Sequence, residues 1–170
     1  CKKIVAGLLN FARKNQVNYQ NMSIIDLVNH GLESLIVPEK VTITVTNKTT
    51  NPVAMFDVEQ MTQVLTNLVK NAFEAMPGGG AIEIILEDTL GDVEITIVDS
   101  GTGIAEDDRS KIFEPFFTTK GIGLGTGLGL ATTYGIVKMH KGQITVDSND
   151  DPGKGPTWTK FKIVLPRGRE

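Results

Sequence analysis

Residues 92–103 have the sequence DVEITIVDSGTG, and this stretch decides the fold. Apolar and polar side chains alternate up to Val98, which predicts a half-buried strand. A second alternating run at 81–88 leads into a turn at 90–92, so the two runs together predict a β-hairpin. A carboxylate, Asp99, follows the second strand directly and is itself followed by two glycines within four residues.

The carboxylate at the end of this strand suggests a contact with a base. Asp99 can accept a hydrogen bond from an exocyclic amine such as that of adenine, and the glycines after it let a flat ring approach the backbone. A hydrogen bond to a charged group contributes roughly 1.5–3 kcal/mol, enough to select adenine over guanine. An ordinary Asp-Ser-Gly turn is the alternative, because these residues dominate turns.

The sequence around the hairpin predicts helices and strands without a regular βαβ alternation. Helices are expected at 23–37, 58–76 and 128–140, further strands at 41–45, 144–147 and 159–165, and an irregular segment at 100–127. Ser23 caps the first helix and Pro38 stops it, whereas Asp57 and Gln60 form a capping box for the second. We therefore expect an α+β fold, a two-layer sandwich with a mixed, mostly antiparallel sheet packed against about three helices.

The bulk composition is that of an ordinary globular domain. The 170 residues include 40% hydrophobic and 22% charged ones, and the net charge of −3 gives no electrostatic footprint for nucleic acid or an anionic membrane. The single cysteine, Cys1, excludes an internal disulfide and fits a reducing compartment. We expect a cytoplasmic domain. Because the chain begins inside an apolar helical pattern at 3–14, followed by a polar linker, we also expect it to be a fragment of a longer protein.

The long helix predicted at 58–76 has an unusual polar face. Gln63, Asn67 and Asn71 follow one another at intervals of four residues beside its apolar stripe. Asn is a poor helix former, so two of them in one helix have a cost in propensity. Amide oxygens are hard ligands, and Mg²⁺ needs few protein ligands when phosphates and waters supply the rest. The face predicts a magnesium site, with a plain polar surface as the alternative.

The segment 120–130, KGIGLGTGLGL, alternates glycines up to the start of the predicted helix at 128–140. Such a backbone can turn its N–H groups toward anionic oxygens, and the helix N-terminus adds partial positive charge. A flexible linker is the alternative, although a linker rarely runs straight into an amphipathic helix. Before it, the segment 112–120 carries Phe113, Phe116 and Phe117, which predicts an aromatic lid or a staple of the loop onto the core.

The four motifs, in this order, resemble those of the catalytic domain of bacterial sensor histidine kinases. This domain belongs to the Bergerat-fold ATP-binding superfamily, which also includes type II topoisomerases and Hsp90-type chaperones. The residues that carry the resemblance are Asn67-Leu-Val-Lys-Asn71 (N box), Asp99-Ser-Gly-Thr-Gly103 (G1 box), Phe113-Glu-Pro-Phe116 (F box) and Gly125-Thr-Gly-Leu-Gly129 (G2 box). Similarity covers roughly 22–166, so the resemblance implies a Bergerat-type fold that binds ATP and Mg²⁺.

The resemblance also implies roles for individual residues. Asn71, with Asn67, is the expected magnesium ligand, and Asn67 and Lys120 are the expected catalytic residues. Asp99 is the expected adenine-reading carboxylate. The remaining residues expected at the nucleotide are Lys70, Gly101, Gly103, Ile104, Thr119, Gly123, Gly125, Thr126, Gly127, Leu128, Gly129 and Thr159. Which of the glycines meets the phosphates stays open, because the sequence has an additional Gly-Ile-Gly-Leu before Gly125.

The residue at position 67 helps to distinguish ATP hydrolysis from phosphate transfer. Superfamily members that hydrolyse ATP carry Glu where this chain has Asn67, and Asn cannot act as a general base. The resemblance therefore favours transfer of the γ-phosphate to a histidine of a dimerisation domain, of which 1–15 are the expected end, 16–21 a linker and 22–170 the catalytic domain. A response regulator is the expected indirect partner. We expect the fragment to be a monomer and the whole protein to be a homodimer, with or without a membrane anchor. ATP hydrolysis and ATP sensing without transfer are the alternatives.

Overall fold

A five-stranded sheet carries the fold in the computed structural model, which describes residues 16–168 apart from residue 124. Its strands lie in the order β2-β4-β5-β7-β6. Their bounds are β2 Val41–Asn47, β4 Gly80–Asp88, β5 Asp92–Asp99, β7 Trp158–Pro166 and β6 Gln143–Asn149. Only the β2–β4 pair is parallel among these described strands, so the sheet is mixed and mostly antiparallel, as predicted.

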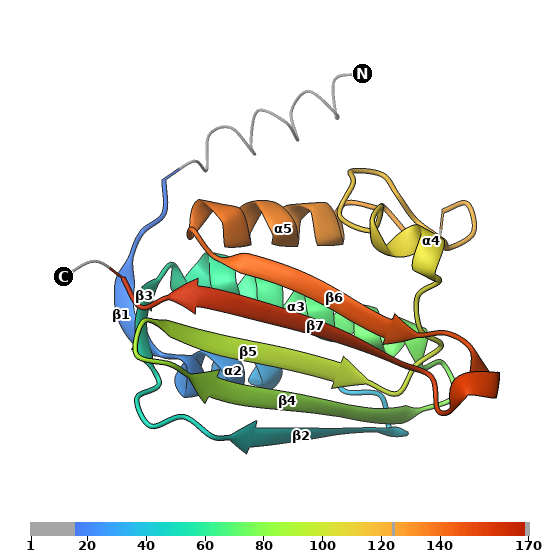
Figure 1. The fold of residues 1–170 in the computed structure, drawn as a ribbon, viewed down its shortest axis with the longest axis horizontal. Helices are drawn as coiled ribbons and strands as arrows, with labels where there is room; N and C mark the ends of the chain where they lie inside the picture. Colours follow the sequence, from blue (N-terminus) through green and yellow to red (C-terminus); the bar gives the residue numbers. More distant parts are fainter. Residues whose placement is uncertain (1–15, 124, 169–170) are drawn as a thin grey trace.

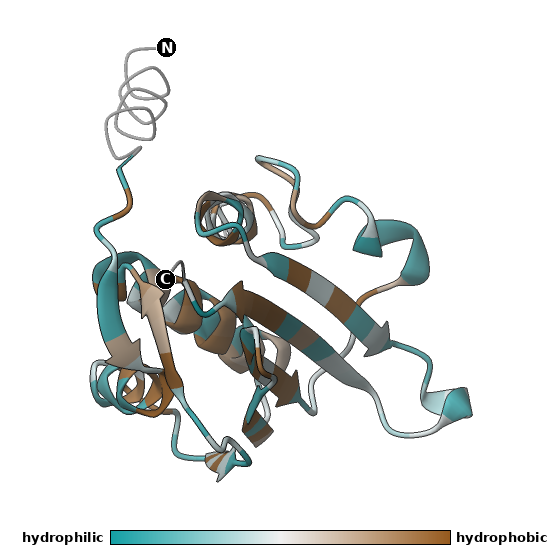
Figure 2. Cartoon of the chain, turned by 60° about the vertical axis from the view of Figure 1, so that its left-hand side comes forward, coloured by the Kyte–Doolittle hydropathy of each residue, from teal (hydrophilic) through white to brown (hydrophobic). Residues whose placement is uncertain are grey.

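Helices cover one face of this sheet (Figure 1). They are α2 Ile24–Glu33, α3 Val58–Ala75 and α5 Gly129–Met139, with a short α4 at Glu106–Arg109 and a 3₁₀ turn, η1, at Pro152–Lys154. The alternation along the strands is visible as bands of colour in Figure 2. On β4, β5 and β7 the apolar positions that face the helices are almost fully buried, which confirms the predicted two-layer α+β architecture.

The long helix α3 forms the centre of the helical layer. Asp57 caps it, accepting the N–H of Gln60 at 3.0 Å. The reciprocal bond of a capping box is absent from this described segment, because the backbone N–H of Asp57 donates to His140 Nε2 at 3.0 Å instead. Nδ1 of His140 therefore carries the proton and donates to the Ile136 carbonyl at 2.8 Å. This histidine ties the end of α5 to the start of α3.

The structure differs from the sequence-based prediction near the N-terminal side of the domain. Gln20–Ser23 form a strand, β1, that pairs antiparallel with β3 at Val53–Phe56. The sequence pattern predicts a linker at Gln20 and Asn21 and indicates neither strand, so this part of the prediction is wrong. α2 ends at Glu33 and not at residue 37, because the Ser34 hydroxyl binds the Gly31 carbonyl at 2.7 Å and closes the last turn. The helix predicted at 3–14 lies outside the described residues.

At the sheet end opposite the β4–β5 turn, strand ends and loops converge. Asp99, Thr159 and Ser148 are register partners across β5, β7 and β6, so all three side chains lie on the helix-facing side of the sheet. α3 and the start of α5 pass over the same end (Figure 1). The loop between β5 and α5 lies beside them and closes off a cavity.

Candidate nucleotide-binding site

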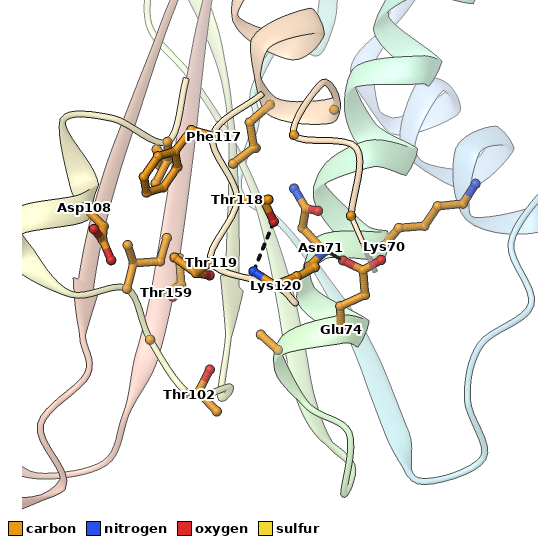
Figure 3. A pocket seen from close by; sticks show the side chains of 18 of the residues that line it. Lys70, Asn71, Glu74, Thr102, Asp108, Phe117, Thr118, Thr119, Lys120 and Thr159 are labelled. Atoms are coloured by element: carbon orange, nitrogen blue, oxygen red, sulfur yellow. Dashed lines mark hydrogen bonds and ion pairs between the residues drawn. The ribbon is translucent and has the colours of Figure 1, made fainter. Parts of the chain in front are cut away.

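A cavity of about 820 Å³ lies between α3, the end of the sheet and the long loop at 100–128. Asn67, Asn71 and Glu74 line it from α3, whereas Asp99 and Thr159 line it from the sheet. Its remaining lining includes Lys70, Thr102, Gly103, Ile104, Ala105, Asp108, Ile112, Phe117, Thr118, Thr119, Lys120, Gly125, Thr126, Gly127, Gly129, Leu130, Asp150 and Phe161. Figure 3 shows Thr118 and Thr119 between Thr159 and the α3 side chains. The volume suits a ligand the size of a nucleotide.

Asp99 is a buried acid at the sheet side of the cavity. Its side chain is 5% exposed and accepts the Gly101 N–H at 2.8 Å. Burial raises the pKa of Asp99 to about 6, and the hydrogen bond from Gly101 opposes part of that shift. A buried carboxylate with unused acceptor capacity is costly, so a ligand that donates a hydrogen bond to it gains free energy.

The loop after Asp99 is pressed against the end of β6. Gly103 has a φ of 79°, and a Cβ there would lie 2.3 Å from the Asn149 carbonyl oxygen, so only glycine fits. The next residue, Ile104, donates its N–H to Ser148 Oγ at 2.8 Å. Arg109 Nε donates to the Ile104 carbonyl at 3.2 Å, and its Nη2 donates to the Ser148 carbonyl at 2.6 Å. Both backbone groups of Ile104 are thereby fixed.

Both asparagines of α3 line the cavity. Asn67 Nδ2 makes long contacts with the Gly129 carbonyl at 3.4 Å and Thr133 Oγ1 at 3.5 Å on α5. Its Oδ1, like the side chain of Asn71 one turn later, remains for a ligand. No group of three or more His, Cys, Asp or Glu that could hold a metal occurs in the described part of the chain. The ligands of a metal at this position would be amide oxygens and phosphate oxygens, and this ligand set fits Mg²⁺.

The loop contributes one cation directly to the cavity. Lys120 forms an ion pair with Glu74 of α3, and its N–H donates to Thr118 Oγ1 at 3.1 Å. Burial lowers the pKa of Lys120 from its ordinary value. Glu74 is one of four acids that line the cavity, with Asp99, Asp108 and Asp150. The lysine expected at the phosphates therefore already has a carboxylate partner in this structure.

The glycine-rich loop folds back on the aromatic segment. Gly127 has a φ of 66°, and a Cβ there would lie 2.5 Å from the backbone of Phe116. Phe116 itself has a φ of 68°, donates its N–H to the Gly127 carbonyl at 2.9 Å and leaves its ring 60% exposed. By contrast, Phe113 and Phe117 pack against the core. Two of the three rings of the aromatic segment, those of Phe113 and Phe117, therefore anchor the loop to the hydrophobic core.

Most of the residues expected at the nucleotide line the cavity, and three do not. Gly101, Gly123 and Leu128 are missing from its lining. Gly101 lies behind it, where a Cβ would come 2.6 Å from Ala75 and where its N–H supports Asp99. Gly123 faces open space, and Leu128 is 42% exposed at the start of α5. Their expected contacts with the nucleotide have no support in this geometry.

The structure also identifies residues in or beside the cavity that the sequence motifs did not indicate. Glu74 follows Asn67 by seven residues and Asn71 by three, so helical spacing alone could have placed it on the same face. Arg109 and Ser148 had no such signal, because their link depends on how the loop packs against β6. Asp108 and Asp150 likewise reach the cavity only through the folding of their loops.

The chain belongs to the family of histidine kinase-, DNA gyrase B-, and HSP90-like ATPases, whose model matches residues 56–169. It is 36% identical over 165 residues to the sensor histidine kinase ZraS of Escherichia coli (strain K12). The aligned region covers 95% of this chain and 35% of ZraS. It is 45% identical over 111 residues to sporulation kinase A of Bacillus subtilis (strain 168), covering 65% of this chain and 17% of that protein.

Among solved structures, the mycobacterial sensor histidine kinase MprB has the same fold. The TM-score is 0.75 at 29% identity, over 87% of this chain and 97% of the MprB chain. The sequence-based assignment to this family and fold is confirmed. The chain spans only about a third or less of the length of the two curated relatives named above.

Proposed function

We propose that this chain binds Mg·ATP in the cavity and donates the γ-phosphate to a histidine on a helical domain elsewhere in the whole protein. The observation that carries the proposal is the placement of Asp99 across the cavity from Asn67 and Asn71, with Lys120 at the loop between them. One end of the cavity suits a purine amine and the other suits a metal-bound triphosphate. The named relatives ZraS and sporulation kinase A are kinases, which supports the same assignment.

The residues of this chain would act mainly by positioning. Asp99 accepts a hydrogen bond from the base, and Gly103 and Ile104 bound the base on one side. Asn67 and Asn71 would hold Mg²⁺, which supplies electrostatic stabilisation of the phosphates when bound. Lys120, Thr119 and the backbone of Gly125, Thr126, Gly127 and Gly129 offer donors to phosphate oxygens. Lys70 lines the cavity from an exposed position on α3 and adds positive charge.

The domain assignment belongs to the same proposal. Residues 1–15, which lie outside the described residues, belong to the dimerisation domain, 16–21 lead into the catalytic domain, and 22–170 form the catalytic part, with β1 starting within the linker. The phosphoacceptor histidine lies on the dimerisation domain, and a response regulator receives the phosphate from it. None of the helices in the described ranges combines the length and apolar character that a membrane span requires.

Phosphotransfer is tested by mixing this chain with a separately produced dimerisation domain that carries the phosphoacceptor histidine. With Mg²⁺ and γ-labelled ATP, we expect acid-labile label on the histidine domain, none when its histidine is replaced, and none with Asp99→Asn. If labelled ATP binds but the histidine domain stays unlabelled, the chain is an ATP-sensing module and the transfer proposal is wrong.

ATP hydrolysis is the second candidate, and one observation bears on it. Glu74 is a carboxylate inside the cavity and could activate water, whereas Asn67 could not. Its ion pair with Lys120 opposes that role, because a carboxylate held by a cation is a weaker base. Release of free phosphate by the chain alone, lost in Glu74→Gln, would support hydrolysis over transfer.

A further inference from the structure

A row of three buried polar side chains crosses the sheet beneath the cavity. Register pairs Asp99 with Thr159 and Thr159 with Ser148, so the row runs through β5, β7 and β6. Their exposed fractions are 5%, 3% and 5%, respectively. Asp99 and Thr159 line the cavity, whereas Ser148 lies one strand further away and does not. Hydroxyls buried in a row must share a limited number of hydrogen atoms.

The partners of Ser148 determine where those hydrogen atoms lie. Ser148 Oγ is 2.7 Å from the Trp158 carbonyl oxygen, which can only accept, so the serine hydrogen is donated there. The N–H of Ile104 is donated to Ser148 Oγ at 2.8 Å and fills one acceptor position. Thr159 Oγ1 lies 3.0 Å from the same oxygen. Since the serine has no hydrogen left, Thr159 must be the donor.

This arrangement fixes the orientation of the Thr159 hydroxyl, which lines the cavity. Its hydroxyl hydrogen points away toward β6, which leaves only oxygen lone pairs for a ligand. Asp99, opposite it on β5, is also an acceptor when ionised. When Asp99 is ionised, these two side chains therefore offer a ligand only hydrogen-bond acceptors. A ring edge with an amine, such as that of a 6-aminopurine, meets them favourably, directly or through a water, whereas a 6-oxopurine presents a further acceptor.

We propose that Ser148 is a positioning residue that sets purine specificity. Without touching the nucleotide, it holds the Thr159 hydroxyl in an orientation in which Thr159 and Asp99 present only hydrogen-bond acceptors to the base. The inference rests on the proposed ATP site and deepens it. Removing the serine oxygen frees the Thr159 hydrogen to turn into the cavity, where it can donate to the carbonyl of a 6-oxopurine. The effect is on selectivity, beyond any general loosening of the fold.

The test compares ATP with inosine triphosphate, whose ring has a carbonyl in place of the 6-amine and a hydrogen on N1. Both dissociation constants are measured with Mg²⁺ by competition against a fluorescent nucleotide at pH 8, above the pKa of Asp99, on the whole 170-residue chain. We expect the unchanged chain to prefer ATP by at least about tenfold. Ser148→Ala should reduce the ratio by roughly fivefold or more, mainly by improving inosine triphosphate binding.

Three variants separate orientation from mere structural support. Ser148→Thr keeps the hydroxyl and should keep the ratio. Once Thr159→Val has removed the hydroxyl that Ser148 orients, adding Ser148→Ala should change the ratio no further. If Ser148→Ala does not fold, Ser148→Cys, a weaker acceptor of similar size, should also lower the ratio.

Three results would overturn the inference, and they are distinguishable. If the unchanged chain binds ATP and Ser148→Ala weakens both nucleotides equally, Ser148 is only structural and the proposed ATP site stands. If the unchanged, folded chain binds neither nucleotide, the proposed function fails and this inference fails with it. A further drop on adding Ser148→Ala to Thr159→Val would also contradict it, because the effect would not pass through Thr159.

Discussion

Glu74 of α3 and Lys120 of the glycine-rich loop form an ion pair at the wall of the cavity. A triphosphate bound in the proposed site would compete with Glu74 for Lys120. The side chains are 49% and 37% exposed, so the pair contributes little to stability, at most about 1 kcal/mol. Its effect should be seen in nucleotide affinity.

Glu74→Gln should tighten ATP binding by roughly two- to fivefold at low salt, because competition for Lys120 and repulsion of the phosphates both disappear. The gain should shrink at high salt. Calorimetric titration at two ionic strengths measures it, and Glu59→Gln, which removes the same charge from an exposed site at the other end of α3, is the control. Weaker binding by Glu74→Gln would mean that the carboxylate serves the ligand.

Asn71→Ala should remove the dependence of ATP binding on Mg²⁺. The amide oxygen is a proposed metal ligand, and no carboxylate cluster in the described ranges could replace it. Affinity is measured with Mg²⁺ and with a chelator, and the ratio of the two dissociation constants should fall toward one. Gln63→Ala, on the same helix but outside the cavity lining, is the matched control and should keep the ratio.

Asp99 should make ATP binding depend on pH. Its pKa of about 6 in the free protein means that the carboxylate is protonated below this value, so affinity should fall as the pH drops through about 6. Carboxyl ¹³C NMR should find this pKa near 6, and added nucleotide should lower it. Asp99→Asn identifies the resonance and should bind ATP far more weakly.

The charge of Asp99 has opposite effects on ATP binding and on stability: ionisation favours binding but destabilises the folded protein. A pKa raised above its unfolded value of 3.8 means that the folded protein binds the proton more tightly. The contribution of Asp99 to the free energy of unfolding is therefore present below pH 3.8 and is lost as the pH rises through about 6. At pH 8 Asp99→Asn should raise the unfolding free energy, by up to 2–3 kcal/mol as an order of magnitude. A melting temperature that falls instead would contradict the buried-charge explanation.

Arg109→Ala should weaken ATP binding by roughly tenfold, because Ile104 loses one of the two groups that hold it against β6. Arg109→Lys should restore little, since an ammonium cannot span both carbonyls as the guanidinium does. The dissociation constant is measured for each variant. Lys111→Ala, at an exposed position two residues later, is the control. Unchanged affinity in Arg109→Ala would show that the loop is held by Ser148 alone.

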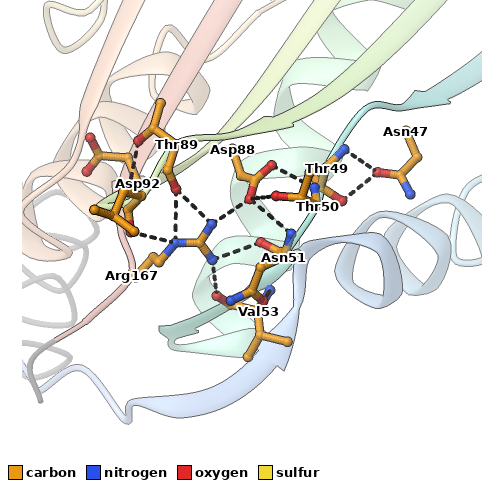
Figure 4. Close-up of polar contacts among 10 residues, drawn as sticks. Asn47, Thr49, Thr50, Asn51, Val53, Asp88, Thr89, Asp92 and Arg167 are labelled. Atoms are coloured by element: carbon orange, nitrogen blue, oxygen red, sulfur yellow. Dashed lines mark hydrogen bonds and ion pairs between the residues drawn. The ribbon is translucent and has the colours of Figure 1, made fainter.

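Arg167 should matter for stability and not for nucleotide binding. Figure 4 shows its guanidinium among Asp88, Thr89, Asn51 and Val53. It donates to Asp88 Oδ2 at 2.7 Å and to carbonyls of the two neighbouring loops. Backbone N–H groups of Thr50 and Asn51, with burial opposing them, lower the pKa of Asp88. This contribution to stability is therefore present at neutral pH and lost as the pH falls through the lowered pKa.

Arg167→Ala should accordingly lower the melting temperature at pH 7 by several degrees while ATP affinity stays the same. The difference from the unchanged chain should shrink in acid, once Asp88 is protonated. Lys162→Ala, which removes the partner of Glu94 on the sheet surface, is the control and should have little effect. A loss of ATP affinity in Arg167→Ala would show that the two ends of the domain are coupled.

Periodicity in the sequence was enough to predict the parts of the fold that are long and regular. The β4–β5 hairpin and α3 are within one residue of their expected bounds. β1 and β3 were missed because each is four residues long and their pairing joins Gln20 to Phe56. A pairing over that distance depends on the whole fold and leaves no local pattern.

Local motifs placed Asp99, Asn67 and Asn71 at the cavity, but they did not predict the tertiary contacts that hold α3 and α5 in position. The bond between the Asp57 N–H and His140 Nε2 spans 83 positions, and the sequence suggested a reciprocal bond from Gln60 instead. Gln60 Oε1 is therefore buried and has no hydrogen-bond partner among the residues that the structure describes. Such contacts depend on tertiary packing, which propensity and spacing do not encode.

The location of α2 bears on how small a working piece of this protein can be. Ile24, Leu27 and Val28 have no exposed surface, and the Leu65 side chain lies against Gly31 so closely that a Cβ would not fit. The recognisable family span starts only at residue 56. A polypeptide trimmed to that span would lose α2, β1, β2 and nearly all of β3, and it would expose the side of α3 that α2 covers. The autonomous folding unit must therefore be longer than the matched span.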